Sequence, residues 1–140
     1  MEKAYEIAAA AVLERLAEHK PELSNALKSL SPGFLTVVPG VHDHVHNIVK
    51  KLGLPFTMDG KFSNAKVIFI NCGYNIGQNA AALRKTVEEG ATLVTSDWAL
   101  TGVISPTFPG TIAQNNGSSG DEVVSVEPNQ NSIWSDVVVP

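Results

Sequence analysis

The chain has 140 residues, of which 44% are hydrophobic and 17% charged, and this composition is that of one globular domain with a substantial core. The net charge of −4 comes from scattered acids without any basic cluster, which argues against nucleic acid as a partner. A single cysteine excludes an internal disulfide, and the sequence shows neither an apolar leader nor a run of about 20 apolar residues that could span a bilayer. We therefore expect a cytoplasmic protein without a membrane partner.

Two helices are predicted at the start of the chain. Glu2–Lys20 is rich in Ala, Leu and Glu and contains no Gly or Pro. Pro21 suits the first position of a second helix over Pro21–Leu30, which the following Ser-Pro-Gly ends. We assign residues 1–32 to an N-terminal helical extension and expect any homo-oligomer to form through it.

Strands alternate with helices from residue 33 onward. Strand-like runs occupy 34–39, 66–71 and 91–95, and helices are predicted near 42–52 and 78–89. This alternation predicts an α/β domain over residues 33–140, a three-layer sandwich with a mainly parallel central sheet. Because each connection is long enough for a crossover, we predict that the three strands are adjacent and parallel. The apolar runs Val67–Ile70 and Leu93–Val94 predict burial of the second and third strands on both faces.

The remaining segments are shorter. "FTM" (56–58) reads as a brief extended piece, and a further short helix is expected after Trp98. A polar, glycine-rich loop is predicted at 114–122 and an alternating strand at 123–128. The valine-rich end leaves open whether the chain is part of a longer protein.

Three of the four histidines fall in the helix predicted near 42–52. Its apolar stripe places His42 and His46 on one flank and His44 on the opposite flank, so a regular helix cannot direct all three to one ion. The i, i+4 spacing of His42 and His46 is nonetheless that of helical zinc sites, and Asp43 adds a carboxylate. The alternative is that Asp43 favours the positive helix N-terminus and the imidazoles lie half-exposed around it.

Polar loops follow each of the three predicted strands. In open α/β sheets ligands bind outside the carboxyl ends of the strands, and consecutive parallel strands present those ends on one edge. We therefore predict a ligand-binding cleft at that edge. Its predicted residues are His42, Asp43, His44, Asn71, Cys72, Asn75, Ser96, Asp97 and Trp98.

The succession of "VPGVHDHVHNIVKKLG", "AKVIFINCG", a helix ending "EEGATLVTSDWAL" and "FPG" resembles the class I glutamine amidotransferase-like superfamily, in its noncatalytic or uncharacterised branches related to trehalose-utilisation proteins. The resemblance covers residues 34–140 and implies a flavodoxin-like fold. It also implies that the cysteine nucleophile of catalytic members would stand at the elbow of residues 95–98, which reads Thr-Ser-Asp-Trp, and no histidine follows His46. Glutaminase activity is therefore not expected.

Several residues near this elbow have both functional and ordinary interpretations. Ser96 would need a base from the histidine cluster to act as a nucleophile, and its turn lacks small flanking residues; otherwise Ser96 and Asp97 cap a helix that begins at Trp98. Cys72, at a buried strand end, is expected to behave as a small apolar residue. Trp98 and Trp134 are expected in the core, with a wall of the cleft as the alternative for Trp98.

Three functions remain open at this point. The first is a noncatalytic amidotransferase-like module that binds a small ligand or a protein partner at the carboxyl edge of its sheet. The second is a metal-dependent hydrolase that uses His42, His46 and Asp97, drawing on the cluster of residues 42–46. The third is a structural assembly domain. The sequence identifies no cofactor.

Overall fold

The computed structural model describes residues 2–112, 120 and 129–132. Within these residues the chain is a small α/β fold with a three-stranded parallel sheet and five α-helices. The strand predicted at 123–128, Trp134 and almost all of the loop predicted at 114–122 lie outside the described residues.

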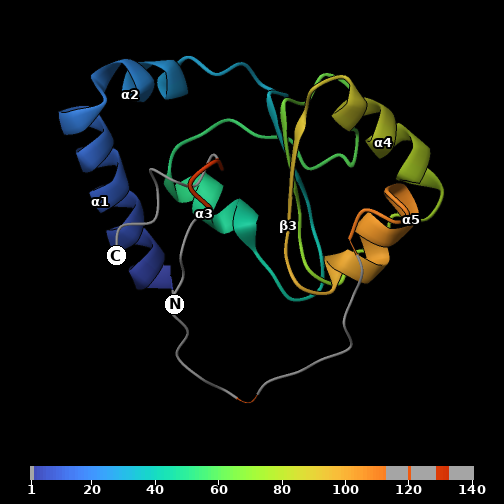
Figure 1. The fold of residues 1–140 in the computed structure, drawn as a ribbon. Helices are drawn as coiled ribbons and strands as arrows, with labels where there is room; N and C mark the ends of the chain where they lie inside the picture. Colours follow the sequence, from blue (N-terminus) through green and yellow to red (C-terminus); the bar gives the residue numbers. More distant parts are fainter. Residues whose placement is uncertain (1, 113–119, 121–128, 133–140) are drawn as a thin grey trace.

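The two N-terminal helices come first, and β-strands and helices then alternate (Figure 1). The 3₁₀ turn η1 leads into α4, and the π-helical turn η2 leads into α5. The elements are α1 (Glu2–His19), α2 (Pro21–Lys28), β1 (Leu35–Val38), α3 (Val45–Lys51), β2 (Val67–Ile70), η1 (Gly77–Asn79), α4 (Ala80–Glu88), β3 (Thr92–Thr95), η2 (Leu100–Ile104) and α5 (Ser105–Thr107).

The sheet confirms the predicted strand arrangement. Its order is β1-β2-β3, and both pairs are parallel. Leu35 of β1 lies beside Val67 of β2, and Val67 lies beside Thr92 of β3. All four residues of β1 are buried. In β2, for which burial on both faces is predicted, Ile68 and Ile70 are buried and Val67 and Phe69 are half-buried. For β3 that prediction is wrong: Thr92 is exposed and the rest is half-buried, because in the described part of the chain β3 pairs only with β2.

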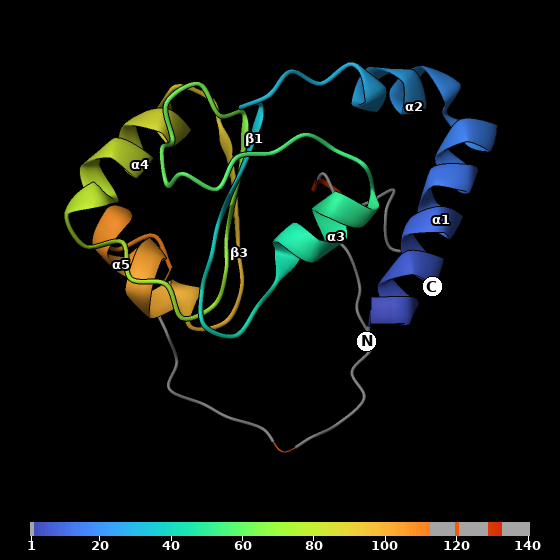
Figure 2. The same cartoon turned by 180° about the vertical axis from the view of Figure 1, so that it is seen from behind.

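Helices cover both faces of the sheet. Figures 1 and 2 show α3 on one face and α4 with α5 on the other. Val37 and Phe69 pack with Val49 of α3, whereas Ile68 and Ile70 pack with Leu83 of α4. The side chains of each strand alternate between the faces, so two hydrophobic clusters form on opposite sides of the same strands.

A single residue, Thr57, explains how the two crossovers reach opposite faces. Right-handed crossovers that advance in one direction across a sheet would place α3 and α4 on the same face. Thr57, however, forms a parallel bridge with Thr36 on the edge of β1 that faces away from β2. Its N–H donates to the Leu35 carbonyl at 3.0 Å, and its carbonyl accepts from the Val37 N–H at 2.9 Å.

The chain therefore leaves β1 through α3 to the outer edge at Thr57, and returns across the opposite face before it enters β2. Phe62 and Ala65, in the returning segment, are buried in the cluster that contains Ile68 and Leu83. If Thr57 is counted as a minimal strand, the spatial order becomes Thr57-β1-β2-β3, and the direction of winding reverses at β1. The carboxyl ends of β1 and β2 thus lie at a topological switch point, the kind of position at which ligands bind in open α/β sheets.

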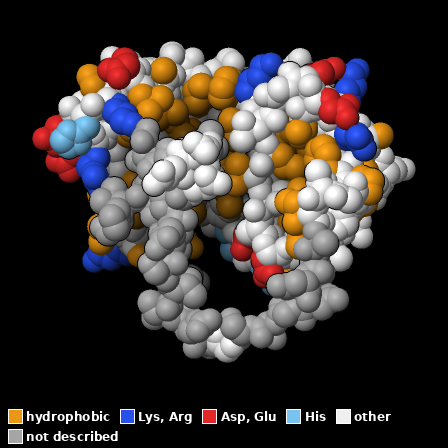
Figure 3. All heavy atoms as spheres, viewed as in Figure 1, with side chains coloured by type: hydrophobic (Ala, Val, Ile, Leu, Met, Phe, Trp, Pro, Cys, Tyr) orange, Lys and Arg blue, Asp and Glu red, His pale blue; other side chains and the backbone are white. Residues whose placement is uncertain are grey.

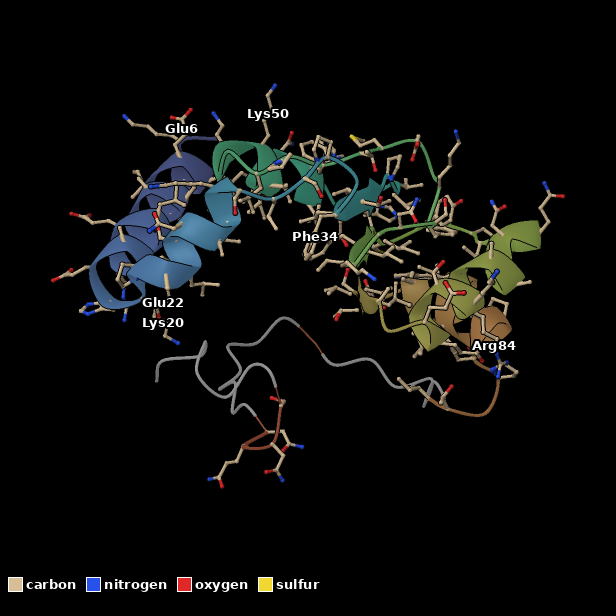
Figure 4. All side chains as sticks on the ribbon, turned by 90° about the horizontal axis from the view of Figure 1, so that it is seen from above. Glu6, Lys20, Glu22, Phe34, Lys50 and Arg84 are labelled. Carbon is tan, nitrogen blue, oxygen red and sulfur yellow. The ribbon has the colours of Figure 1, made fainter. Side chains whose placement is uncertain are left out.

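The N-terminal helices lie beyond α3. Seen from above, α1 with Glu6 and α3 with Lys50 lie on one side of the strands and α4 with Arg84 on the other (Figure 4). Glu6 accepts an ion-pair hydrogen bond from Lys51 of α3. The space-filling view shows hydrophobic side chains gathered between α2 and the strands (Figure 3), and Ile7 and Val12 of α1 are exposed. Oligomer formation through these helices stays a prediction.

The helix predicted near 42–52 begins later than expected, at Val45, because the N–H groups of Val41 and His42 bind the carbonyl of Cys72. None of the helices in the described ranges combines the length and hydropathy that a membrane crossing requires.

Candidate functional site

The carboxylate of Asp43 joins the three loops that follow the strands. Its Oδ2 accepts a hydrogen bond from the Cys72 N–H at 3.0 Å and another from the Ser96 hydroxyl at 2.5 Å. Asp43 follows β1, Cys72 follows β2 and Ser96 follows β3. Asp43, Cys72 and Ser96 therefore bring the three loops together at one edge of the sheet, as the sequence predicts.

The loops after β1 and β2 are also joined through their backbones. The N–H groups of Val41 and His42 donate to the Cys72 carbonyl at 2.9 and 3.4 Å. A Cβ atom on Gly40 would lie 2.2 Å from that carbonyl oxygen, so only glycine permits this approach. These contacts hold residues 40–43 against the β2 loop, and α3 therefore cannot begin at residue 42.

The β2 loop is held on its other flank by η2. The Ile76 N–H donates to the Gly102 carbonyl at 3.0 Å, and a Cβ atom on Gly102 would lie 2.3 Å from the Tyr74 carbonyl oxygen. Residues 71–76 are thus packed between two glycine contacts, one from each neighbouring segment.

The pKa of Asp43 lies below its ordinary value. The hydrogen bond from the Ser96 hydroxyl is the largest cause, and the bond from the Cys72 N–H comes next. Partial burial acts in the opposite direction, and the charges of His42 and His44 add a smaller lowering. At neutral pH this group is a carboxylate whose lone pairs are used to bind two neighbouring loops.

Asp97 occupies a sharp turn between β3 and η2. Its φ of +47° lies in the left-handed region, which aspartate tolerates better than most residues. The Cys72 thiol faces it, with Sγ donating to Oδ2 at 3.9 Å. Cys72 is buried, as predicted.

Two expectations for this turn are wrong. Ser96 and Asp97 do not cap a helix that begins at Trp98: the Ser96 hydroxyl binds Asp43, and the helical turn η2 has Ala99 as its N-cap without a side-chain hydrogen bond. Trp98 does not pack in the core, since 68% of its surface is exposed. An exposed tryptophan beside the elbow instead offers an apolar contact at the carboxyl edge.

A cavity of about 110 Å³ lies at the carboxyl ends of β2 and β3, next to the start of α3. Asn71 projects from the sheet face that carries Phe69 and is only 1% exposed. Neither Oδ1 nor Nδ2 of its amide has a hydrogen-bond partner within the described part of the protein. The residues that line the cavity are Val45, Phe69, Ile70, Asn71, Val94, Thr95 and Ser96.

A buried amide without partners is unusual and energetically unfavourable. Buried polar side chains in proteins nearly all have partners, and leaving one unpaired costs about 1–3 kcal/mol. Asn71 lies beside a cavity that is also lined by the exposed Ser96, while both polar atoms of its amide are shielded from solvent.

The histidines are arranged differently from the helical prediction. His42 precedes α3, and its ring lies against Gly73 of the β2 loop, 3.3 Å from where a Cβ would stand. The rings of His44 and His46 contact each other edge to face, with centroids 5.6 Å apart. The predicted separation of His44 from His46 is therefore wrong, because residues 42–44 are not helical.

No metal-binding group of three or more His, Cys, Asp or Glu side chains exists among the described residues. His42, His46 and Asp97 accordingly do not gather into such a group, and the metal alternative gains no geometric support. Asn75, another predicted site residue, is exposed and accepts a hydrogen bond from the Gly77 N–H at 3.0 Å, which places it in a local turn.

Sequence reasoning missed the apolar walls of the cavity. Val45, Phe69 and Val94 line it together with Asn71 and Ser96. The signal was available in the strand parity: positions 67, 69 and 71 share one face of the sheet, as do 92, 94 and 96.

Comparison with protein-family models, curated proteins and solved structures gives no match for this chain.

Proposed function

We propose that the chain is a noncatalytic, amidotransferase-like module that binds a small ligand at the carboxyl edge of its sheet. The observation that carries this proposal is the cavity at the carboxyl ends of β2 and β3, which is lined by Val45, Phe69 and Val94 together with Ser96, the residue that binds the carboxylate of Asp43. Apolar walls with a few convergent polar groups are typical of ligand pockets.

The winding of the chain supports the finer assignment to a flavodoxin-like, three-layer arrangement. Counting Thr57 as an edge strand gives the order in which flavodoxin-like folds begin, with the reversal between β1 and β2. The elbow adds a second point of likeness, because Asp97 stands with a positive φ at the turn where the resemblance puts a nucleophile.

The chemistry of the elbow supports binding over catalysis. The Ser96 hydroxyl donates a hydrogen bond to the carboxylate of Asp43. The lowered pKa of Asp43 makes this carboxylate a poor general base. Cys72, the thiol that faces Asp97, is buried at a strand end. These arrangements do not supply the activated nucleophile that acyl transfer requires.

A fragment screen on the isotopically labelled protein tests the proposal. We expect small neutral fragments to shift the backbone amide of Ser96 and the side-chain amide of Asn71. The variant Asn71→Leu, which changes the wall of the cavity, should abolish the Ser96 shift, and the matched variant Asn25→Leu, at an exposed site on α2, should leave both shifts intact. Fragments that bind only elsewhere, or equal binding to Asn71→Leu, would refute the assignment.

A further inference from the structure

The Ser96 hydroxyl can act toward a ligand only as a hydrogen-bond acceptor. Its single proton is donated to Oδ2 of Asp43 at 2.5 Å, while its oxygen keeps acceptor lone pairs. Ser96 is exposed and lines the cavity at the carboxyl ends of β2 and β3. Resting on the function proposed above, we propose that this cavity binds a small aliphatic ammonium, with the hydrocarbon inside and the charged head at Ser96.

The walls of the cavity suit a hydrocarbon group. Apolar side chains come from the start of α3 and from the two strands, namely Val45, Phe69 and Val94. A cavity of about 150 Å³ holds benzene in a well-studied engineered protein, so the volume of about 110 Å³ found here suits roughly four carbon atoms. An isobutyl group has this size.

Polar contact comes from the rim of the cavity. Both polar atoms of the Asn71 side chain are shielded from solvent, and strand alternation turns the Thr95 side chain toward the opposite face of the sheet. The exposed Ser96 therefore supplies the hydroxyl that a ligand meets. Because the proton of this hydroxyl is already donated to Asp43, the ligand head must itself be a donor.

The charge beside Ser96 favours a cation. Oδ2 of Asp43 accepts the Ser96 hydroxyl and the Cys72 N–H. Asp97, the residue after Ser96, is exposed and adds a second carboxylate to this loop. The opposing charges that act on Asp43 are those of His42 and His44, and imidazole groups are ordinarily neutral above about pH 8. An ammonium at Ser96 would then lie one hydrogen bond away from a carboxylate.

Other head groups fit less well. A carboxylate offers acceptors alone to a hydroxyl that can only accept, and it is repelled by the charge of Asp43. An alcohol can donate to Ser96 but gains nothing from that charge. An ammonium meets both conditions, since it has three donors and a positive charge.

Three probes with the same isobutyl group separate these cases. Isobutylammonium, isobutanol and isovalerate carry a cationic, a neutral and an anionic head. NMR titration of the intact chain at about pH 8 follows the backbone amides of Val45, Val94 and Ser96. We expect the dissociation constant of isobutylammonium to be about two- to fivefold lower than that of isobutanol, the range of an exposed charge pair. Isovalerate should bind more weakly than isobutanol by a similar factor.

Salt and two variants identify the source of the preference. Sodium chloride at about 1 M should reduce the ratio of the isobutanol and isobutylammonium dissociation constants toward one, because salt screens exposed charges. Asp43→Asn should reduce the same ratio, and the matched variant Glu14→Gln, at an exposed carboxylate of α1, should leave it unchanged. The wild-type ratio and its salt dependence decide the question even if Asp43→Asn fails to fold.

The outcomes separate this inference from the proposed function. Isobutanol or isovalerate binding at Ser96 as tightly as isobutylammonium would overturn the ammonium assignment and leave the binding function standing. A preference for isobutylammonium that persists unchanged at high salt, or in a folded Asp43→Asn, would do the same. Absence of shifts at Val45, Val94 and Ser96 with every probe and every neutral fragment would overturn both.

Discussion

The hydroxyl of Thr57 lies 2.7 Å from that of Thr36, and this contact joins the outer edge of β1 to a segment that is 21 residues away in sequence. The same two residues form the parallel bridge that adds Thr57 to the outer edge of the three-stranded sheet. The reversal of winding at β1 depends on this edge pair.

Replacing either threonine by valine should lower the free energy of unfolding by about 1–2 kcal/mol, because the remaining hydroxyl loses its partner at a part-buried position. The double variant Thr36→Val/Thr57→Val should be destabilised by less than the sum of the singles, with a coupling of about 1 kcal/mol. Urea unfolding of the four proteins measures this. Strict additivity would show that the hydroxyls do not interact.

Asp43 should make the stability of the fold depend on acid pH. The native pKa is lowered from 3.8, so the unfolded chain takes up the proton first as the pH falls. The contribution is therefore complete above 3.8 and is lost as the pH falls through the lower native pKa.

Asp43→Asn should be less stable than the wild type by about 1 kcal/mol at neutral pH. The difference in the free energy of unfolding should shrink as the pH falls from 3.8 through the lower native pKa of Asp43. Urea titrations at several pH values would show the difference, with Glu14→Gln, an exposed carboxylate of α1, as control. A stability gap that stays constant across the window would contradict the assignment of the pKa shift to folding.

Gly40 should tolerate no side chain. A Cβ at this position would stand 2.2 Å from the Cys72 carbonyl oxygen, which is backbone and cannot rotate away. Gly40→Ala should destabilise the protein by about 1–3 kcal/mol, the typical cost of overpacking, and toward the upper end because the group in contact is fixed. Gly120→Ala, which has nothing within 4 Å of the added Cβ, should change stability by less than about 0.5 kcal/mol. Urea unfolding of both variants and the wild type measures these differences.

Cys72 should react with thiol reagents only when the structure opens. It is 3% exposed and its thiol faces Asp97, so a colorimetric disulfide reagent should label the native protein slowly and the urea-unfolded protein fast. Cys72→Ser should keep the binding of small fragments, because the Asp43 bond uses the backbone N–H at this position. Rapid labelling of the native protein would instead identify a reactive thiol.

The strands and their parallel order followed from sequence because continuous apolar runs with long connections leave few alternatives. The start of α3 did not, since Val41 and His42 give their N–H groups to the Cys72 carbonyl, a residue that local periodicity cannot connect with them. The bridge between Thr57 and Thr36 could not be predicted either, because a single residue shows no hydrophobic periodicity.

The candidate site was predictable in part. Asp43, Cys72 and Ser96 were expected at one edge because parallel strands end there together, and their contacts agree. The exposure of Trp98 and the contact between His44 and His46 depend on turns whose shape is set by tertiary hydrogen bonds. Strand parity would have placed Asn71 on the α3 face, and only the packing around it shows that its amide is unpaired.

The two glycine contacts that enclose residues 71–76, at Gly40 and at Gly102, bear on the kinetics of ligand entry. Because these contacts hold both sides of the loop, we expect that it does not need to change conformation before a ligand enters. Association should then proceed in one step, with an observed rate that rises linearly with ligand concentration and shows no slow phase of loop closure. Differences in affinity among related ligands should then lie mainly in their rates of dissociation.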